Sequence, residues 1–492
     1  MIREDPRFGV SGISLYMPPL CVNLEDWCRW TGNSWEKVSS VVGHSFRMLD
    51  RHESIYTMAA NAVLRLILSY DIDPQRIGFL GFGTESSTDN ALGAVIIKGM
   101  VDRALEEMGR QRISRNCEVP EFKQACLGGV YALKAALRWL ALDGRGRVGV
   151  VVSADKAEYE RGSSGEPTQG AGAVAQLVEE NPRLYTIDFL RGGSASDYRG
   201  ADFRKPFQRH FMEGYARQVE RLHDFPVFSG KYSTNCYIDE TIHAVHDMLR
   251  KIEVEPRSFY HEVHGAFFHR PYARMPVNAM ASLYLWGLSR TEDHQQELEG
   301  ICTQAGADFI RVRDEMTSSP DLFHGVLQGQ TDGEVYPESM KAVKYFRTTE
   351  KFEEVVSSKM TLGADLMMDL GNLYTASLPA WIASGIEEAL ERDLELAGKE
   401  FVTIGYGSGD AAEAMPIRVV PDWRAAASRV GFRKALERRM DLTQEQYESL
   451  HDRHEIPDLE YVPTGRFVVE RIGREQGPEF QDVGVEYYRY VP

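Results

Sequence analysis

The amino-acid sequence predicts a protein of the α/β class. Short apolar runs of strand length alternate with longer segments of helical spacing, which is the pattern typical of α/β proteins. Hydrophobic residues make up 43% of the 492 residues, enough apolar material to bury a core, so wholesale disorder is excluded. The length allows two or three average domains or one large two-lobed unit.

Four apolar runs predict strands, at residues 76–82, 147–153, 171–178 and 401–406, and each ends in Gly, Ser or acidic residues where a loop begins. The clearest helix spans 127–140, because Val130, Leu133, Leu137 and Leu140 recur at spacings of three and four. A second helix is predicted at 386–396, with one face mostly charged.

The remaining segments have weaker local patterns. Residues 289–344 are polar and lack a strong period, so we expect helices and loops that decorate the core and do not form a separate domain. After Val420 the chain turns charged and helical, and residues 461–490 suggest a terminal hairpin or strand pair. GFGTES, which begins at Gly81, and GYGSGD, which begins at Gly405, are weakly similar in sequence, and this internal similarity is called the echo below.

Charge and cysteine content narrow the class of partner and the compartment. The formal net charge of −17 argues against nucleic acid or an anionic membrane as the main partner, although a few local basic side chains can still hold a phosphate. The six cysteines form no CxxC pair, which predicts neither a disulfide framework nor a zinc cluster. With a charged N-terminus and no run of about 20 apolar residues, we expect a reduced, cytoplasmic, soluble protein.

Cys126 stands directly before the clearest predicted helix, in EFKQACLGGVYALKAAL. A cysteine at a helix N-terminus meets the positive end of the helix dipole and free backbone N–H groups, which stabilise a nucleophilic thiolate. Gly128 and Gly129 leave room for a substrate. The alternative is that Cys126 is a small core residue.

Glu85 follows a predicted strand, in GFGTESSTDN. A desolvated carboxylate at a strand end has a raised pKa suited to removing a proton, and the alternative is an ordinary loop acid. The GFG does not extend to the full GxGxxG of a dinucleotide site.

Three histidines lie close together in HEVHGAFFHRPY: His261, His264 and His269. No HExxH or carboxylate pattern accompanies them, so no metal site is predicted. His269 follows an aromatic pair, which suits a proton donor held in an apolar cleft. Core or surface positions are expected for the other two.

Two glycine-rich runs and one amide offer backbone and side-chain donors. GSSGEPTQGAGAVA, from Gly162, either wraps a narrow substrate arm or forms a tight loop. In GYGSGDAAEA the Gly407–Gly409 turn either aims N–H groups at an oxyanion or is a plain loop. In GNLYTASLPAW, Asn372 supplies a side-chain amide.

Taken together, these segments resemble the HMG-CoA synthase family within the thiolase-like condensing enzymes. The matching motifs occur in the family's order through most of the chain: GTESSTD at Glu85, EFKQAC at Cys126, SADKAEY at Asp155, GEPTQGAGAVA after Gly165, ADFRKP at Asp202, GKYSTNCY at Lys231, FHRPYAR at His269, GNLYTASL at Asn372 and GYGSGDAAEA at Gly405. GEPTQGAGAVA, FHxPY and GNxYTASL are specific in combination.

The resemblance implies a layered αβαβα fold of two similar halves, which would account for the internal echo. We expect an N-terminal half at 1–184 with Glu85 and Cys126, and a C-terminal half at 185–420 with His269 and Asn372. A helical insertion at about 289–344 and a C-terminal extension at 421–492 complete the predicted unit.

The resemblance also implies a reaction. Cys126 takes an acetyl group from acetyl-CoA, and Glu85 removes a proton from its methyl. The resulting enolate attacks acetoacetyl-CoA while His269 polarises or protonates the ketone oxygen, and water releases HMG-CoA. CoA thioesters are then substrates, and no separate cofactor or metal is expected.

Further residues carry roles by the same resemblance. Backbone N–H groups of Cys126 and Ser408 would stabilise the thioester oxyanion, Asn372 would orient the second substrate, and Asp155 and Asp202 would support the site. The predicted CoA and substrate set consists of Ser164, Thr168, Ser233, Arg274, Asn278 and Tyr374, where a guanidinium suits a phosphate at Arg274.

Two positions depart from the family's pattern. Leu127 replaces the usual Tyr after the nucleophile, which bears on the shape of the acetyl pocket. Asn278 replaces a second basic residue, which predicts weaker binding of the CoA nucleotide end. The family suggests a homodimer.

Three other functions are alternatives to the formation of free HMG-CoA. The main alternative is a β-branching HMG synthase that acts on a ketone tethered to an acyl carrier protein in polyketide biosynthesis. The lost basic residue at Asn278 is compatible with it, whereas Arg274 and the long C-terminal portion favour free HMG-CoA formation. A non-catalytic scaffold is disfavoured by Cys126, Glu85 and His269 in their expected contexts, and simple thioester cleavage lacks the thiolase Cys-His motifs.

Overall fold

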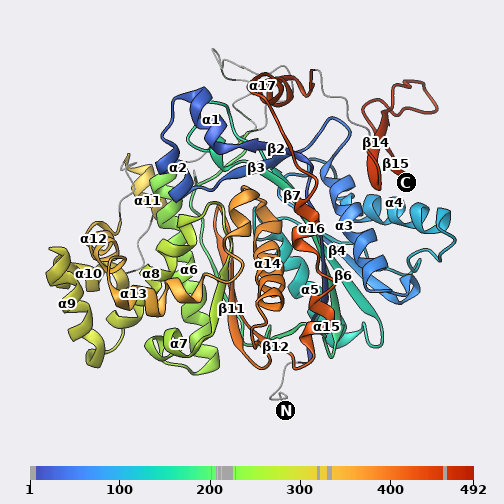
Figure 1. The fold of residues 1–492 in the computed structure, drawn as a ribbon. Coiled ribbons are helices and arrows are strands. Elements are labelled where there is room, and N and C mark those ends of the chain that lie inside the picture. Colours follow the sequence, from blue (N-terminus) through green and yellow to red (C-terminus); the bar gives the residue numbers. More distant parts are fainter. Residues whose placement is uncertain are drawn as a thin grey trace.

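A mixed β-sheet runs through the centre of the computed structural model, with helices on both of its faces (Figure 1). The structure describes residues 7–200, 202–206, 208, 212, 225–227, 229–318, 322–329, 335–457 and 463–492. The predicted α/β class is confirmed.

Within these residues the sheet has ten strands. Their order is β10 (Gly265–Phe268), β11 (Glu400–Gly407), β12 (Ala411–Val419), β8 (Tyr185–Ile187), β1 (Phe8–Tyr16), β7 (Gly170–Glu180), β6 (Val148–Ala157), β4 (Ile77–Gly83) and β5 (Glu121–Phe122), with β9 (Gly193–Ser196) paired to β12. All four predicted strands are present, and the bounds of each differ from the prediction by a few residues.

The sheet repeats one pairing pattern on either side of its middle. β4 and β6 pair in parallel, and β6–β7 and β7–β1 pair antiparallel. On the other side β10 and β11 pair in parallel, and β11–β12 and β12–β8 pair antiparallel. The two halves meet at β1 and β8.

This repeat does not explain the echo between GFGTES and GYGSGD. The first motif ends β4 and the second ends β11, whereas the pairing pattern makes β4 equivalent to β10 and β11 equivalent to β6. The expectation that similar halves account for the echo is therefore wrong. The two motifs instead share a packing role, because the glycines at the ends of β4 and β11 allow the same helix to pack close to both strands.

That helix is α5 (Gly128–Leu142), which begins just after Cys126 and was predicted at 127–140. A Cβ added at Gly83 of β4 would lie 2.4 Å from Gly129 Cα, and one at Gly407 of β11 would lie 2.2 Å from Gln124 O. The α5 end is thus held between strands of both halves, and Cys126 lies where they converge.

The second central helix, α14 (Ser377–Glu391), differs from its prediction. The expected range of 386–396 covers only its last turns and overruns its end at Arg392. Its first half is uniformly buried, so it shows no charged face, and Asp393 adopts φ 52°, which stops the helix.

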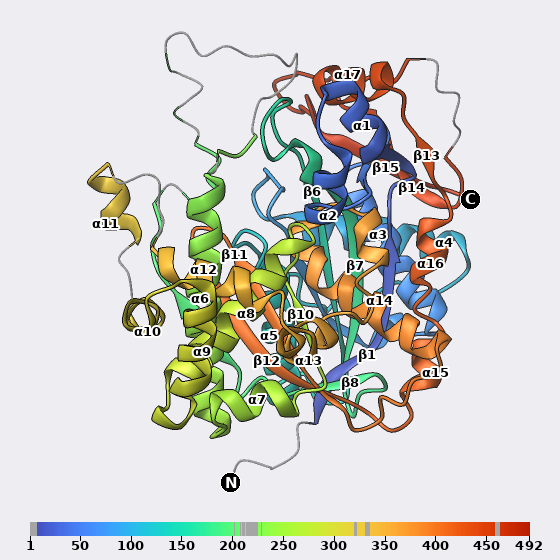
Figure 2. The same ribbon diagram turned by 60° about the vertical axis from the view of Figure 1, so that its left-hand side comes forward.

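Outer helices cover the sheet. They are α3 (Ile55–Ser69) and α4 (Gly93–Glu107) on the N-terminal half, and α6 (Gly230–Ile252), α7 (Pro256–Glu262) and α8 (Arg274–Ser289) on the C-terminal half. Figure 2 shows α6 and α8 beside β11, and α3 and α4 on the opposite side of the molecule.

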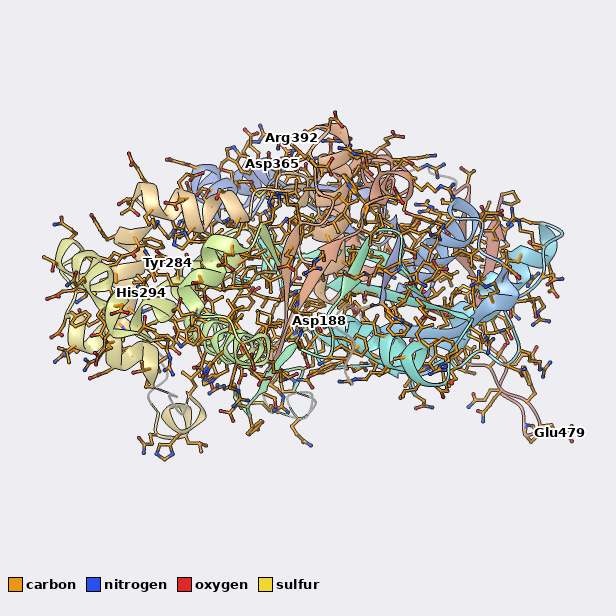
Figure 3. The ribbon with its side chains drawn as sticks, turned by 90° about the horizontal axis from the view of Figure 1, so that it is seen from below. Asp188, Tyr284, His294, Asp365, Arg392 and Glu479 are labelled. Atoms are coloured by element: carbon orange, nitrogen blue, oxygen red, sulfur yellow. The ribbon has the colours of Figure 1, made fainter. Side chains whose placement is uncertain are left out.

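Residues 289–344 form short helices against α8, as expected, apart from the part of this range that lies outside the described residues. They are α9 (Gln295–Ala305), α10 (Phe309–Thr317), α11 (Leu322–Leu327) and α12 (Pro337–Phe346), followed by α13 (Glu350–Val355). In Figure 3, Tyr284 and His294 mark this end of the molecule and Glu479 marks the other.

Two segments far apart in the sequence, residues 20–48 and 440–453, pack together at the top of the molecule in Figure 1. α1 (Leu24–Thr31), α2 (Trp35–Val41), β2 (Leu20–Asn23) and β3 (Ser45–Met48) pack with β13 (Met440–Asp441) and α17 (Gln444–Arg453). α15 (Trp423–Ala427) and α16 (Phe432–Leu436) precede them. The predicted terminal hairpin is β14 (Arg466–Ile472) with β15 (Glu486–Val491); residues 461 and 462 of that prediction lie outside the described residues.

Within the described residues, one helical stretch, Ala125–Leu142, is long and apolar enough to cross a membrane, and 67% of it is buried inside the molecule. It is the central helix α5, and a core helix of a globular protein has the same composition.

Candidate active site

A cavity of about 560 Å³ opens at the converging ends of β6, β10 and β11 and the start of α5. This volume lies within the range of small-molecule sites. Of the predicted residues, eight line it: Cys126, Ser164, Thr168, Ser233, His269, Asn372, Tyr374 and Ser408. Residues from both halves of the sheet therefore share one cavity.

Cys126 lies at the inner end of this cavity, on a sharp turn into α5. Ala125 before it adopts φ 44°, a left-handed conformation that is strained for a residue with a side chain. The turn aims Sγ at Glu85, to which it donates a hydrogen bond of 3.4 Å to Oε2.

The sulfur is not held ionised, contrary to the expectation from the helix dipole. Burial raises the pKa of the Cys126 thiol well above its usual range, and the negative charges of Glu85 and Asp155 raise it further. Because desolvation disfavours the thiolate more strongly than one helix end favours it, the resting group is a thiol that points at a base.

Glu85 follows β4, and its contact with the Cys126 thiol makes it the candidate base. Burial raises its pKa to about 7, with Lys205 opposing the shift and Asp155 adding to it. A carboxylate with this pKa is divided between charged and neutral forms near neutral pH, where general bases work best.

Asp155, at the end of β6, holds the loop that carries Glu85. Its Oδ1 accepts hydrogen bonds from Thr84 Oγ1 (2.8 Å), Glu85 N (2.8 Å), Ser86 N (2.9 Å) and Ser86 Oγ (2.6 Å). Its Oδ2 accepts from Thr375 N at 3.0 Å and from the Thr375 hydroxyl. Asp155 thus joins the two halves behind the site and does not itself line the cavity.

His269 follows β10 and lines the cavity with its ring buried. Its backbone N donates to Ile404 O of β11 at 2.7 Å, and its carbonyl accepts from the Tyr237 hydroxyl at 2.8 Å. Burial lowers the pKa of His269 to about 3. The imidazole is therefore neutral, with one N–H to donate. The other histidines of the segment lie elsewhere: His261 is 3.5 Å from Glu354 and His264 packs on Phe401.

Asn372 and Ser408 complete the inner cavity. Asn372 Oδ1 accepts from Tyr374 N at 2.9 Å and Ser377 Oγ at 3.3 Å, and the Asn372 side chain also forms a hydrogen bond with the Tyr159 side chain. Ser408 follows β11, whose Gly407 lies against the backbone of Gln124, so the backbone of residue 408 is brought close to Cys126.

Two aromatic residues next to Cys126 carried no predicted role. Tyr159 and Phe203 pack edge-on with Tyr374, with ring centroids 5.8 to 6.4 Å apart, and enclose the sulfur with Ala157. Burial raises the pKa of Tyr159 and of Tyr374, so both hydroxyls stay protonated. Both lie in quoted motifs, SADKAEY and ADFRKP, but a lone aromatic in a loop gives no local signal.

Leu127 does not line the cavity. Its side chain is fully buried and packs against Gly405 and Gly407 of β11, on the core side of the turn. The replacement of the usual Tyr is therefore a change in helix packing, and the aromatic side chains around the sulfur come from Tyr159, Phe203 and Tyr374.

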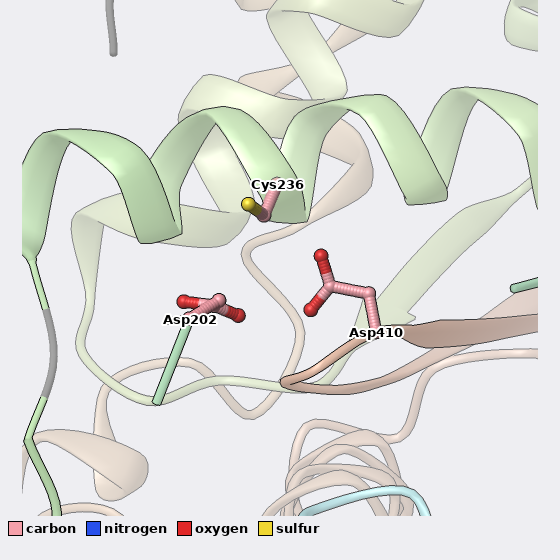
Figure 4. Close-up of side chains that lie close together, drawn as sticks. All are labelled: Asp202, Cys236 and Asp410. Atoms are coloured by element: carbon pink, nitrogen blue, oxygen red, sulfur yellow. The ribbon is translucent and has the colours of Figure 1, made fainter. Parts of the chain in front are cut away.

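Asp202 lies close to Asp410 and Cys236 (Figure 4). Their ligand-type atoms lie within 4.8 Å of one another, a spacing compatible with a metal ion. However, Asp202 accepts from Ser233, from Tyr406 Oη at 3.1 Å and from Gly409 N at 3.3 Å, and Asp410 Oδ1 accepts from Tyr406 Oη at 2.6 Å.

The contacts favour a shared proton in this cluster. Burial, and then the charge of Asp202, raise the pKa of Asp410 to about 9, so Asp410 is neutral at neutral pH. Two carboxyl groups this close cannot both ionise easily. Asp202 therefore supports the Ser408–Gly409 turn and the start of α6, where Ser233 lines the cavity.

The predicted CoA residues divide into two groups. Ser164, Thr168, Ser233 and Tyr374 line the cavity, whereas Arg274 and Asn278 lie outside it on α8. Arg274 donates to Ser40 O at 3.4 Å, beside the lining residue Val41.

Comparison with known proteins agrees with this arrangement. A family model described as hydroxymethylglutaryl-coenzyme A synthase N terminal matches residues 5–182, and one described as hydroxymethylglutaryl-coenzyme A synthase C terminal matches residues 202–465. A hydroxymethylglutaryl-CoA synthase of Haloferax volcanii is 28% identical over 472 residues, covering 93% of this chain and 96% of the relative. Hydroxymethylglutaryl-CoA synthase A of Dictyostelium discoideum is 26% identical, covering 94% and 86%.

Solved structures share the fold. MvaS in complex with 3-hydroxy-3-methylglutaryl coenzyme A has a TM-score of 0.76 at 24% identity, covering 99% of this chain and all of that one. The curacin biosynthetic pathway HMG synthase in complex with holo donor-ACP has a TM-score of 0.68 at 20% identity, covering 98% of this chain. The predicted thiolase-like fold is confirmed.

Proposed function

The chain belongs to the hydroxymethylglutaryl-CoA synthase family, and we propose that it condenses acetyl-CoA with acetoacetyl-CoA and water to give HMG-CoA and CoA. The observation that carries the proposal is the hydrogen bond from the Cys126 thiol to Glu85, because Cys126 lines the same cavity as His269. The nucleophile and the electrophilic donor thereby share one cavity, and the base is hydrogen-bonded to the nucleophile.

The first step is acetyl transfer to sulfur. As Sγ attacks the thioester carbonyl of acetyl-CoA, Glu85 accepts the thiol proton and then gives it to the departing CoA thiolate, so that CoA leaves as the thiol and Glu85 is again a carboxylate. Backbone N–H groups of Cys126 and Ser408 stabilise the oxyanion in this proposal, because negative charge develops on the carbonyl oxygen. The product is an acetyl group on Cys126.

The second step forms the carbon–carbon bond. Glu85, as a carboxylate, removes a proton from the acetyl methyl, and the enolate attacks the ketone carbon of acetoacetyl-CoA. Neutral His269 donates a hydrogen bond to the ketone oxygen, and Glu85 now holds the proton that the new hydroxyl needs. Water then cleaves the Cys126 thioester and releases HMG-CoA.

Mass spectrometry of the protein with acetyl-CoA alone tests the first step. We expect one acetyl group, a mass gain of about 42 units, on the peptide that contains Cys126. We expect none on a Cys126→Ser variant. Active protein whose Cys126 peptide stays unmodified would contradict the mechanism.

Glu85→Ala separates the two steps. We expect acetylation of Cys126 to survive at a reduced rate, while condensation falls by about 10²–10⁴-fold, the usual contribution of a general base. Equal loss of both steps would assign Glu85 to the thiol alone.

The acceptor is tested by supplying acetoacetyl-CoA and then an acetoacetyl group on an acyl carrier protein. Faster turnover of free acetoacetyl-CoA supports the proposal, and preference for the carrier-bound form supports β-branching in polyketide biosynthesis.

We further propose a cytoplasmic homodimer that acts in the mevalonate pathway and uses no cofactor beyond its CoA thioesters. The family supports the dimer and the pathway, and six free cysteines support a reducing compartment. Light scattering coupled to size exclusion tests the dimer.

A further inference from the structure

Two arginines lie near each other, next to helices that line the cavity. Arg274 is the first residue of α8 and Arg347 ends α12, and both side chains are partly buried. Arg347 Nη1 donates to Asn278 Oδ1 at 3.1 Å. Because Asn278 follows Arg274 by four residues on one helix, it lies about one turn further along the same face. Burial, and then the charge of Arg274, lower the pKa of Arg347, as expected for neighbouring cations.

Within the described part of the chain, neither arginine has a carboxylate partner. Among the residues that the structure describes, no carboxylate lies within ion-pair distance of either guanidinium, in a chain with 73 acidic and 56 basic residues. Arg274 donates to the backbone carbonyl of Ser40, and among the described residues the buried Nε of Arg347 has no hydrogen-bond acceptor. Buried cations are normally paired, so this pair has unused capacity for an anion.

The pair borders the cavity on two elements. Met275, next to Arg274, and Met340, seven residues before Arg347 on the same face of α12, both line the cavity. Ser40, which accepts from Arg274, precedes the lining residue Val41. Both arginines therefore lie on, or directly after, helices that contribute residues to the cavity.

We propose that Arg347, together with Arg274, binds the phosphate of a pantetheine-phosphate carrier whose thioester end reaches Cys126, with Asn278 positioning Arg347. The inference rests on the proposed function, since it takes the carrier arm as the occupant of the cavity. Arg347 then supplies, from another helix, the second positive charge that position 278 lacks. The phosphate belongs either to free CoA or to a carrier protein's phosphopantetheine.

Calorimetric titration of the whole protein with CoA, 4′-phosphopantetheine and pantetheine tests this site without requiring turnover. Arg347→Ala is expected to weaken CoA binding by about tenfold or more, the loss typical for a charged hydrogen bond, and to leave pantetheine binding unchanged. Arg347→Lys should recover part of the loss. Arg392→Ala removes an equal charge from an exposed pair with Glu388 (Figure 3) and should change nothing.

The two sources of phosphate give different results. Weaker binding of CoA alone assigns Arg347 to the nucleotide phosphates of free CoA, and weaker binding of both CoA and 4′-phosphopantetheine assigns it to the phosphate that both carriers share. Unchanged CoA binding by Arg347→Ala overturns the proposal, as does an equal loss for CoA and pantetheine in a variant whose thermal unfolding midpoint matches the parent protein.

Failure of the proposed function is recognised separately. Absence of acetyl-Cys126 in the parent protein removes the reaction, yet a phosphate-dependent loss in Arg347→Ala would still establish the anion site. Acetylation with unchanged CoA binding by the variant removes only the anion site.

Discussion

Glu85 and Cys126 share one hydrogen bond, and the charge of each group depends on the other. Burial raises the pKa of both, and the negative charge of Glu85 raises that of the thiol further. The resting pair is therefore a thiol and a carboxyl group that is partly ionised near pH 7. His269 adds no charge, because burial lowers its pKa to about 3.

The pH dependence of acetyl transfer follows from Glu85. The base must be a carboxylate, so kcat/KM for acetyl-CoA should rise with pH through a midpoint near 7, the pKa of Glu85, and fall to about one tenth of its plateau one unit below it. Initial rates of Cys126 acetylation between pH 5.5 and 9 measure this profile. In Glu85→Gln the rising limb should vanish, and its persistence there would assign the titration to another group.

Asp410 should make stability depend on pH. Its pKa is about 9 in the folded protein and near 3.8 when exposed, so its stabilising contribution is complete below about pH 4 and is lost as pH rises toward 9. Asp410→Asn keeps the acceptor for Tyr406 and Gly409 but cannot ionise. The free energy of unfolding of the variant, relative to the parent protein, should therefore increase with pH by at most about 1.4 kcal/mol per unit.

Urea unfolding at pH 5, 7 and 8.5 measures this difference. A difference that stays constant across these values would show that Asp410 is ionised in the folded state. Asp202, Cys236 and Arg199 face the same group, and because Asp202 and Asp410 titrate as a pair, the difference reports the ionisation of that pair.

At the residue level, the sequence predicted the cavity residues that stand in distinctive motifs. Cys126, His269 and Asn372 were found in this way. Tyr159 and Phe203 were not, since single aromatics carry no local pattern. Arg347 was also missed, because its partner Asn278 is 69 residues away and only the fold brings them together.

At the level of elements, glycines set the distance between β4 and α5. Gly83 lies so close to Gly129 that any Cβ would overlap the helix backbone. This contact fixes Cys126 relative to Glu85, which follows β4 by two residues. The strand ends and the helix start therefore act as one rigid support for the reacting pair.

Gly83→Ala should separate these elements. We expect overpacking to lower the free energy of unfolding by about 1–3 kcal/mol and the condensation rate to fall by about tenfold or more, because reacting groups tolerate little displacement. Gly99→Ala is the matched control. Gly99 lies mid-way along α4 with open space around it, so the variant should gain about 1 kcal/mol and keep full activity. A Gly83→Ala protein that condenses at the parent rate would contradict the role of this contact.

The elements found from sequence were those with an unbroken local signal. The strands β4, β6, β7 and β11 are apolar runs, and α5 has clear helical spacing. α14 was misplaced because its buried first half, SLPAWIASGI, contains Pro and Gly and lacks an amphipathic period. The order of strands in the sheet could not be predicted from local patterns, because β1 pairs with β7 and β8, which come much later in the sequence.

Over the whole molecule, the C-terminal hairpin is joined to the N-terminal half by a buried charge. Arg466 at the start of β14 donates to Glu53 Oε1 at 2.7 Å, Asp50 Oδ2 at 2.8 Å and Tyr16 Oη at 2.9 Å. The next residue, Phe467, donates its N–H to Asn61 of α3 at 2.9 Å. Segments more than 400 residues apart in the chain thus depend on one guanidinium.

Arg466→Ala should destabilise the protein without altering its chemistry. Removing the cation leaves Asp50 and Glu53 buried without their partner, which typically lowers the free energy of unfolding by about 3–5 kcal/mol. Arg433→Ala, which breaks an exposed pair with Glu391, should lower it by about 1 kcal/mol or less. Because Arg466 lies outside the cavity, kcat and KM of the folded variant should match the parent protein at temperatures below its unfolding transition. Similar losses in the two variants would mean that the hairpin is held by its apolar contacts, with Phe467 and Tyr490 as the residues to vary next.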